Sequence, residues 1–187
     1  MERERSDGPA WVPELEMPEA LRAKRGRGFR KERLDRRLHE RLAAHFHANV
    51  ARFRAEHAIE EIGSGARNTI PTLIFEDAAF NAQLAQDLKP LTEAWAGMAL
   101  ATSACYGIRC YQRGVYLHNH VDRAPHVFSA TVCVEHALDS PWPLHIEDVD
   151  GNASQVHMEP GEFVFYEGMR LAHGRPRLFN ISRKPFQ

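Results

Sequence analysis

The sequence lacks several features that would place it in a common functional class. It has no apolar run of about 18 residues, so no segment is predicted to span a bilayer. Its formal net charge is −1, from 24 basic and 25 acidic residues, which gives no general case for binding nucleic acid or anionic membranes. Its three cysteines have no CxxC spacing and are predicted to be reduced thiols. Because the N-terminus, MERERSDGPA, has no apolar signal region, we predict an intracellular, cytoplasmic protein.

Two amphipathic helices are predicted in the first half of the chain. From about Phe29 to Ile62, apolar residues recur at spacings of three and four, which predicts one long helix. Its apolar stripe consists of Leu34, Leu38, Leu42, Phe46, Val50 and Phe53. A second helix is predicted over residues 77–97, with Asp77 as its N-cap. Pro90 lies inside this second helix and is expected to kink or split it.

Residues 21–37 form a strongly basic segment at the start of the first predicted helix. A run of like charge is usually a solvated surface, so we predict a solvated helix face here. Contact with RNA or with an acidic partner is the alternative interpretation.

After Gly97 the sequence changes to short strand-like runs separated by turn signals. A further short strand over residues 69–75 contains Pro71, which predicts a position at a sheet edge. Several short strands at close spacing favour an antiparallel sandwich or barrel. The sequence therefore predicts an α+β fold with N-terminal helices packed on one sheet. We expect a basic extension with its long helix over residues 1–60 and a β-rich domain over residues 61–187.

The stretch LHNHVDRAPH, residues 117–126, is the first candidate for a functional site. On a strand, His118, His120 and Asp122 would share one face, and an H-x-D pair can supply two metal ligands. A third ligand has to come from elsewhere, and His173 stands alone after an aromatic strand. Two histidines and one carboxylate make the facial triad that suits non-haem Fe(II) and leaves positions for O₂ and a co-substrate.

Arginines near His173 are candidates for binding the carboxylate of such a co-substrate. Arg175, Arg177 and Arg183 all follow His173 within ten residues. A guanidinium binds a carboxylate through two parallel hydrogen bonds, which is the physical reason to expect arginine here.

The order of these motifs is similar to that of a known family. The chain resembles the Fe(II)- and 2-oxoglutarate-dependent dioxygenases, above all the prolyl 4-hydroxylase catalytic domain. The likeness covers roughly residues 60–183 and lies in the stretches YGIRCYQRGVYLHNHVD, PHVFSATVCV and WPLHIEDVDGNASQVHMEPGEFVFYEGMRLAHGRP. An H-x-D pair, a Pro-Gly turn before an aromatic strand and a distal histidine, in that order, are more specific than H-x-D alone.

The resemblance implies a fold, a reaction and a set of site residues. His120, Asp122 and His173 match the iron ligands, and Tyr111 matches a tyrosine whose hydroxyl contacts 2-oxoglutarate. Arg183 falls near the position of the basic residue that binds the distal carboxylate, with Arg175 as the alternative. The implied fold is a double-stranded β-helix, or jelly roll. The implied reaction decarboxylates 2-oxoglutarate to succinate, using Fe(II) and O₂ and with ascorbate as a further cofactor, and hydroxylates a peptide or protein substrate, with proline as the leading candidate.

The sequence departs from the family pattern in three places. Tyr116 stands one position before a second expected tyrosine, where this chain has Leu117, and His118 is an extra potential ligand. After His173, the end of the chain, LFNISRKPFQ, does not resemble the family's final core strand. We therefore expect the domain over residues 61–187 to lack its last strand.

Three alternative functions remain open at this point. One is a catalytically impaired jelly roll that binds a ligand without turnover. Another is a cupin-like metalloenzyme that uses no 2-oxoglutarate and recruits His118 as a ligand. A nucleic-acid demethylase is a weaker alternative that rests on the basic segment alone.

Overall fold

The computed structural model describes residues 25–55 and 72–177. Several sequence predictions concern residues outside these ranges: Arg183, the expected lack of a last strand after His173, Pro71 itself, and the boundary between residues 60 and 61. Within the described residues the elements are α-helices and antiparallel strands, as predicted for an α+β fold. None of the described helices is long and apolar enough to cross a membrane.

The first predicted helix is shorter than its apolar stripe suggests. Residues Phe29–Arg33 form strand β1, and helix α2 covers only Arg36–Asn49. The helix begins there because the carboxylate of Asp35 accepts hydrogen bonds from the backbone N–H groups of Arg37 and Leu38. After α2 come a 3₁₀ turn, Val50–Arg52, and the short strand β2, Arg54–Ala55. The prediction of one long helix from Phe29 was therefore wrong at both ends.

The described part of the basic segment is not one helix face: it covers the residues before β1, β1 itself and the first residues of α2. Its side chains form ion pairs with acidic residues of neighbouring elements. Arg27 contacts Asp148 at 3.1 Å, and Lys31 contacts Glu162 at 2.9 Å. Arg33 contacts the same Glu162 at 3.3 Å. These pairs neutralise much of the described basic charge. The prediction of a helix was wrong for β1, whereas the side chains of Lys31 and Arg33 are exposed to solvent, at 40% and 59%.

The second predicted helix is confirmed nearly to the residue. Helix α3 covers Ala78–Ala96, and Asp77 caps it by accepting a hydrogen bond from the N–H of Phe80. Gly97 ends it in the left-handed conformation, at φ 77°, with its N–H bonded to the carbonyl of Glu93. Pro90 lies within the continuous helix, so the expected split does not occur.

The remaining strands form three antiparallel sheets among the described residues. Strands β3 (Leu73–Phe75) and β4 (Ile108–Cys110) pair with β2 in the order β2-β3-β4, so β3 is central and not an edge strand as predicted. The second sheet has the order β1-β9-β6, with β6 at Ser129–Val132 and β9 at Glu162–Tyr166. The third has the order β5-β10-β7-β8, and its strands are Leu117–His120, His173–Arg175, Leu144–Glu147 and Ala153–Val156.

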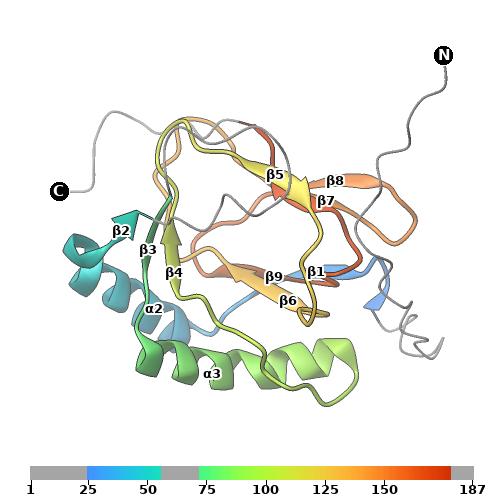
Figure 1. Cartoon of the computed structure of the whole chain (residues 1–187), viewed down its shortest axis with the longest axis horizontal. Helices are drawn as coiled ribbons and strands as arrows, with labels where there is room; N and C mark the ends of the chain where they lie inside the picture. The colour runs from blue at the N-terminus through green and yellow to red at the C-terminus, as the bar shows by residue number, and fades with distance from the viewer. Residues whose placement is uncertain (1–24, 56–71, 178–187) are drawn as a thin grey trace.

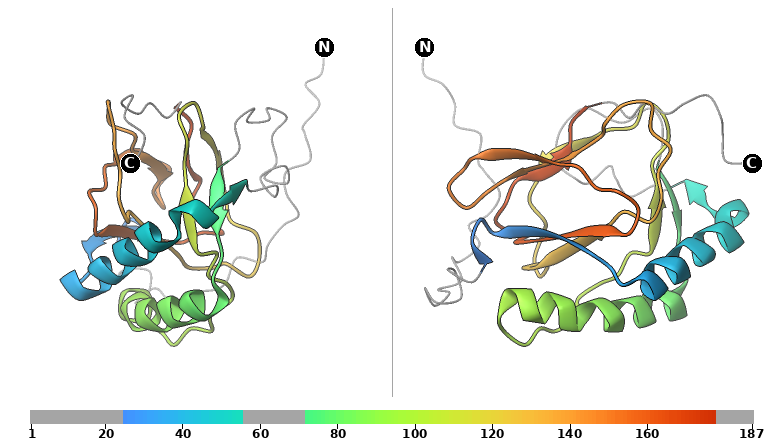
Figure 2. Two further views of the ribbon diagram at one scale, coloured as in Figure 1. Left: turned by 90° about the vertical axis from the view of Figure 1, so that its left-hand side faces the viewer. Right: turned by 180° about the vertical axis from the view of Figure 1, so that it is seen from behind.

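Strand β9 separates two apolar clusters, and this alternation defines the layers of the fold. Phe163 and Phe165 point toward the helices, where they pack with Leu38, Leu42, Leu84 and Trp95. Val164 and Tyr166 point the other way and pack with Leu144 and Ile146 of β7. The helices therefore cover one face of the sheet β1-β9-β6, and the sheet β5-β10-β7-β8 faces its other side (Figures 1 and 2).

Candidate metal centre

Two strands that are far apart in the sequence place the candidate ligands side by side. Strand β10 lies between β5 and β7. In its register, His173 stands opposite His120 on one side and opposite Ile146 on the other. Asp122 lies just beyond the end of β5, where its N–H donates to the carbonyl of Gly168 at 2.8 Å. Asp122 is therefore held by a loop contact and not by the strand alternation that the sequence suggested.

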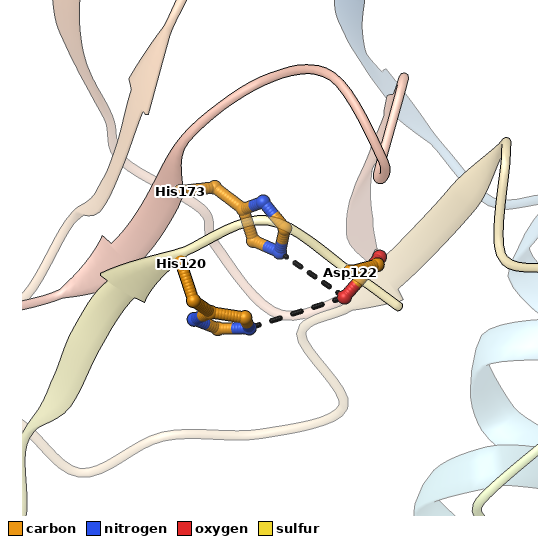
Figure 3. Close-up of side chains that lie close together, drawn as sticks. All are labelled: His120, Asp122 and His173. Carbon is orange, nitrogen blue, oxygen red and sulfur yellow. Dashed lines mark ion pairs between the residues drawn. The ribbon is translucent and has the colours of Figure 1, made fainter. Parts of the chain in front are cut away.

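The ligand atoms of His120, Asp122 and His173 converge on one point (Figure 3). Each residue offers one ligand atom within 4.8 Å of the other two. The Oδ1 atom of Asp122 lies 3.6 Å from Nε2 of His173 and 3.9 Å from Nε2 of His120. This is the only such group of histidine, cysteine and acidic residues among those that the structure describes.

Both histidines present the same ring nitrogen to this point because the other nitrogen is hydrogen-bonded. Nδ1 of His120 lies 2.8 Å from the carbonyl oxygen of His118, and Nδ1 of His173 lies 2.8 Å from that of Leu171. A carbonyl only accepts, so each Nδ1 carries the proton. In the neutral ring the lone pair is then on Nε2, and in both histidines Nε2 is the nitrogen that faces Asp122, which is how metal-binding histidines are oriented.

The carboxylate of Asp122 is fixed by its other oxygen. The hydroxyl of Ser129 donates to Oδ2 at 2.6 Å, which leaves Oδ1 facing the histidines. Gly168 lies against the same oxygen: a Cβ atom built there would overlap Oδ2 and would come within 2.6 Å of the Ser129 hydroxyl. A side chain at position 168 is thus incompatible with this carboxylate position.

Burial affects the charges of two of the three candidate ligands. Burial by itself raises the pKa of Asp122, but the His173 ring and the Ser129 hydroxyl outweigh it and leave the pKa below its usual value. Burial lowers the pKa of His120. Asp122 is thus favoured as the anion and His120 as the neutral ring, which are the forms that bind a metal ion.

The donor set fits a divalent transition metal. Ligand atoms about 2.1 Å from an ion and at right angles to one another are about 3 Å apart. The observed separations of 3.6 and 3.9 Å need only small side-chain rotations to reach that spacing. The His173 side chain is 4% exposed, whereas those of His120 and Asp122 are 16% and 20% exposed. An ion held here would be anchored on a buried side and accessible on the other.

A half-buried arginine, Arg175, follows His173 on β10. Nη1 of Arg175 donates to the carbonyl of Trp142 at 2.7 Å, and its guanidinium lies 4.7 Å from the centre of the Trp142 ring. Tyr111 packs edge-on against the same ring at 5.0 Å, and Tyr166 contacts the ring of His173 at 4.4 Å. Burial lowers the pKa of Arg175. No carboxylate among the described residues forms an ion pair with it, so this half-buried cation has capacity for an anion.

The other sequence candidates take different places. His118 is not part of the converging group; it contributes its carbonyl to His120, and its ring packs edge-on against Tyr116 at 4.7 Å. Sequence reasoning missed Ser129 and Gly168, since a serine and a glycine have no spacing that marks them as partners of Asp122. Trp142 had a weak signal as a tryptophan between two prolines.

Comparison with known proteins gives a match in structure and none in sequence. No family model matches the chain, and no curated protein is similar to it. The crystal structure of a Pseudomonas putida prolyl-4-hydroxylase matches with a TM-score of 0.55 and 20% identity, over 87% of this chain and 90% of that chain. A provisionally assigned oxygenase from Shewanella oneidensis matches with a TM-score of 0.43 and 12% identity, over 88% of this chain and 78% of that chain. The first match shows that the chain has the fold of a prolyl-4-hydroxylase.

Proposed function

We propose that this protein is an Fe(II)- and 2-oxoglutarate-dependent dioxygenase that hydroxylates a peptide or protein side chain. The observation that carries the proposal is the convergence of His120, Asp122 and His173. Their place on a prolyl-4-hydroxylase-like fold supports it. The two facing sheets, β1-β9-β6 and β5-β10-β7-β8, correspond in this proposal to the two halves of a jelly roll.

His120, Asp122 and His173 would together hold the ion. Fe(II) in such a site supplies the redox chemistry that couples O₂ and 2-oxoglutarate to hydroxylation, and ascorbate would keep the iron reduced. The chain's own part is to hold the ion through two neutral imidazoles and one carboxylate. Ser129 and the backbone carbonyls of His118 and Leu171 keep those groups aimed at one point.

Arg175 is our candidate for binding the distal carboxylate of 2-oxoglutarate. It is half-buried and lacks an acidic partner among the described residues. It lies on β10 two residues after His173, so both side chains belong to the same strand face. Tyr111 packs on the same tryptophan, and its hydroxyl would contribute a neutral hydrogen bond to the co-substrate. Arg183 remains the alternative and lies outside the described residues.

Substrate access is expected on the open side of the centre. His120 and Asp122 keep partial exposure there, whereas His173 is buried behind them. A protein side chain entering from this side would meet the open coordination positions. Proline is the leading substrate, because the structurally similar Pseudomonas protein is a prolyl-4-hydroxylase.

The test is the formation of succinate from 2-oxoglutarate by the purified protein with Fe(II), O₂ and ascorbate, with and without proline-containing peptides. Turnover should require Fe(II) and should disappear in Asp122→Ala. Lys31→Met is the matched control, because Lys31 lies on β1 and pairs with Glu162 away from the centre. Binding of 2-oxoglutarate without succinate formation would instead identify an impaired binding module. Metal binding without any affinity for 2-oxoglutarate would favour a cupin-like metalloenzyme.

A further inference from the structure

The turn between β9 and β10 contacts two of the three candidate ligands. This segment, Glu167 to Leu171, is called the ligand turn below. The carbonyl of Gly168 accepts the backbone N–H of Asp122 at 2.8 Å. The carbonyl of Leu171 accepts Nδ1–H of His173, also at 2.8 Å. A shift of the ligand turn would therefore displace Asp122 and His173 together.

Backbone hydrogen bonds to Glu167 close the ligand turn. Its carbonyl accepts the N–H groups of Arg170 and Leu171 at 3.0 and 2.9 Å. Its own N–H donates to the carbonyl of Gly28 at 3.0 Å. The backbone of the turn is thus closed on itself and joined to the residues that lead into β1.

The side chain of Glu167 forms a buried ion pair with Arg25. Nε of Arg25 donates to Oε1 of Glu167 at 2.8 Å, and the two side chains are 0% and 7% exposed. Arg25 also donates to the carbonyl of Ala96 at 3.2 Å and lies over the ring of Phe128 at 5.3 Å. It therefore connects the ligand turn with the end of α3 and with the residue that precedes Ser129.

The energetics of this pair argue for a role in positioning. Burying two charges is costly, so a buried ion pair is often replaceable by apolar side chains without loss of stability. Here Nη2 of Arg25 has no hydrogen-bond partner among the described residues, which adds to that cost. What the pair does provide is directional contact between the ligand turn, the end of α3 and the segment that contains Ser129.

We propose that Arg25 and Glu167 are positioning residues for the metal centre, which fix the ligand turn so that Asp122 Oδ1 and His173 Nε2 face the same point. The inference rests on the proposed function, because the centre that the pair positions is the proposed iron site. It assigns a role to the segment just before β1 that its sequence does not suggest.

The test compares three variants: Arg25→Met with Glu167→Leu in one chain, Glu167→Gln, and Lys31→Met. The double variant removes both charges and so avoids leaving one buried alone. Glu167→Gln keeps the acceptor for Nε of Arg25. Lys31→Met removes an ion pair between β1 and β9 whose lysine side chain is 40% exposed. Co(II) affinity by calorimetry, the visible spectrum of the Co(II) protein and the melting temperature of the metal-free protein are measured for each.

The double variant should bind Co(II) about 10- to 100-fold more weakly, the range seen when partners of metal ligands are removed. Its Co(II) spectrum should change, and Glu167→Gln and Lys31→Met should retain affinity within a few fold. In the metal-free protein, ¹⁵N NMR of the imidazoles should show loss of the hydrogen-bonded Nδ1–H of His173 in the double variant only. If the double variant does not fold, Glu167→Ala takes its place. A Glu167→Ala protein with a lowered melting temperature but wild-type affinity for Co(II) would overturn the proposal.

Two results separate this inference from the proposed function. A double variant with wild-type affinity, spectrum and imidazole signal would show that the pair is merely structural, while the metal centre stands. A wild-type protein that does not bind Co(II), or that binds it equally well after Asp122→Ala, would refute the metal centre. In that case the imidazole signal of His173 still decides whether Arg25 and Glu167 position the turn.

Discussion

At the scale of single residues, the two histidines and the aspartate are oriented by different means. His120 and His173 each donate Nδ1–H to the backbone carbonyl two residues earlier, so each ring is set by its own local chain. Asp122 instead depends on Ser129 and Gly168, which come from two other segments. The carboxylate is therefore the candidate ligand most sensitive to changes elsewhere in the molecule.

Gly168→Ala should disrupt the centre without contacting the ion itself. The added methyl group would overlap Oδ2 of Asp122 and crowd the Ser129 hydroxyl, so the carboxylate has to rotate away from the histidines. We expect Co(II) affinity to fall about 10- to 100-fold, as for lost partners of metal ligands. Calorimetric titration of the purified variant measures it.

Gly151→Ala is the control for Gly168→Ala. Nothing lies within 4 Å of a Cβ built at Gly151, but its φ of +81° is unfavourable for alanine. It should lose about 1–2 kcal/mol of stability and keep its Co(II) affinity. Equal affinity in both glycine variants would show that Oδ2 of Asp122 can move without consequence.

Arg175→Met should weaken binding of 2-oxoglutarate and leave metal binding intact. Removing one partner of a buried, hydrogen-bonded charge pair costs about 2–5 kcal/mol, which is at least about 30-fold in affinity. Methionine keeps much of the apolar contact with Trp142. The measurement is the dissociation constant of 2-oxoglutarate for the protein loaded with Mn(II). If Arg183→Met loses affinity for 2-oxoglutarate and Arg175→Met does not, Arg183 is the residue that binds the distal carboxylate.

At the scale of elements, the sequence predicts well a helix whose ends depend on neighbouring residues. It predicts poorly a strand that depends on pairing with a distant segment. Helix α3 was predicted because Asp77 and Gly97 are cap residues that act through neighbouring backbone groups. Strand β1 was missed because Phe29 is its only apolar residue, so Phe29–Arg33 shows no alternation of apolar and polar residues. What makes Phe29–Arg33 a strand is its pairing with β9, whose residues lie at the other end of the sequence. No helical or strand periodicity within the segment reports that pairing.

Pro90→Ala should stabilise helix α3. Pro90 is exposed and lies in the middle of a continuous helix, where it lacks the N–H that would bond to the carbonyl of Gln86. Alanine restores that hydrogen bond and should raise the free energy of unfolding by about 1–3 kcal/mol. Thermal unfolding measures it, and Lys89→Ala is the neighbouring control, expected within about 0.5 kcal/mol of wild type. A lower melting temperature in Pro90→Ala would mean that the proline ring makes packing contacts that outweigh the missing bond.

At the scale of the whole molecule, the centre joins parts of the fold that only the tertiary structure brings together. His120, Asp122 and His173 could be named from the sequence because histidine and aspartate at motif spacing have a recognisable chemistry. Ser129, Gly168, Glu167 and Arg25 could not, because their roles depend on which loops meet behind the ligands. The sequence therefore indicates which atoms contact an ion, and the fold determines what keeps them in place.

This arrangement predicts that metal binding stabilises the whole fold. An ion at the centre would link β5 to β10 and, through the ligand turn, to the end of α3 and the start of β1. At a free Mn(II) concentration 100 times the dissociation constant, the native state gains about 2.7 kcal/mol. For a chain of this size that corresponds to a rise of about 5–11 °C in melting temperature.

Scanning calorimetry with and without Mn(II) measures this shift, and EDTA should reverse it. Asp122→Ala should show no shift, because two imidazoles without the carboxylate bind a hard divalent ion weakly. The chain has 11 histidines, so a shift that persists in Asp122→Ala would mean that Mn(II) binds at other sites. A shift that is present in wild type and absent in Asp122→Ala connects the stability of the fold to the three converging ligands, independently of any catalytic activity.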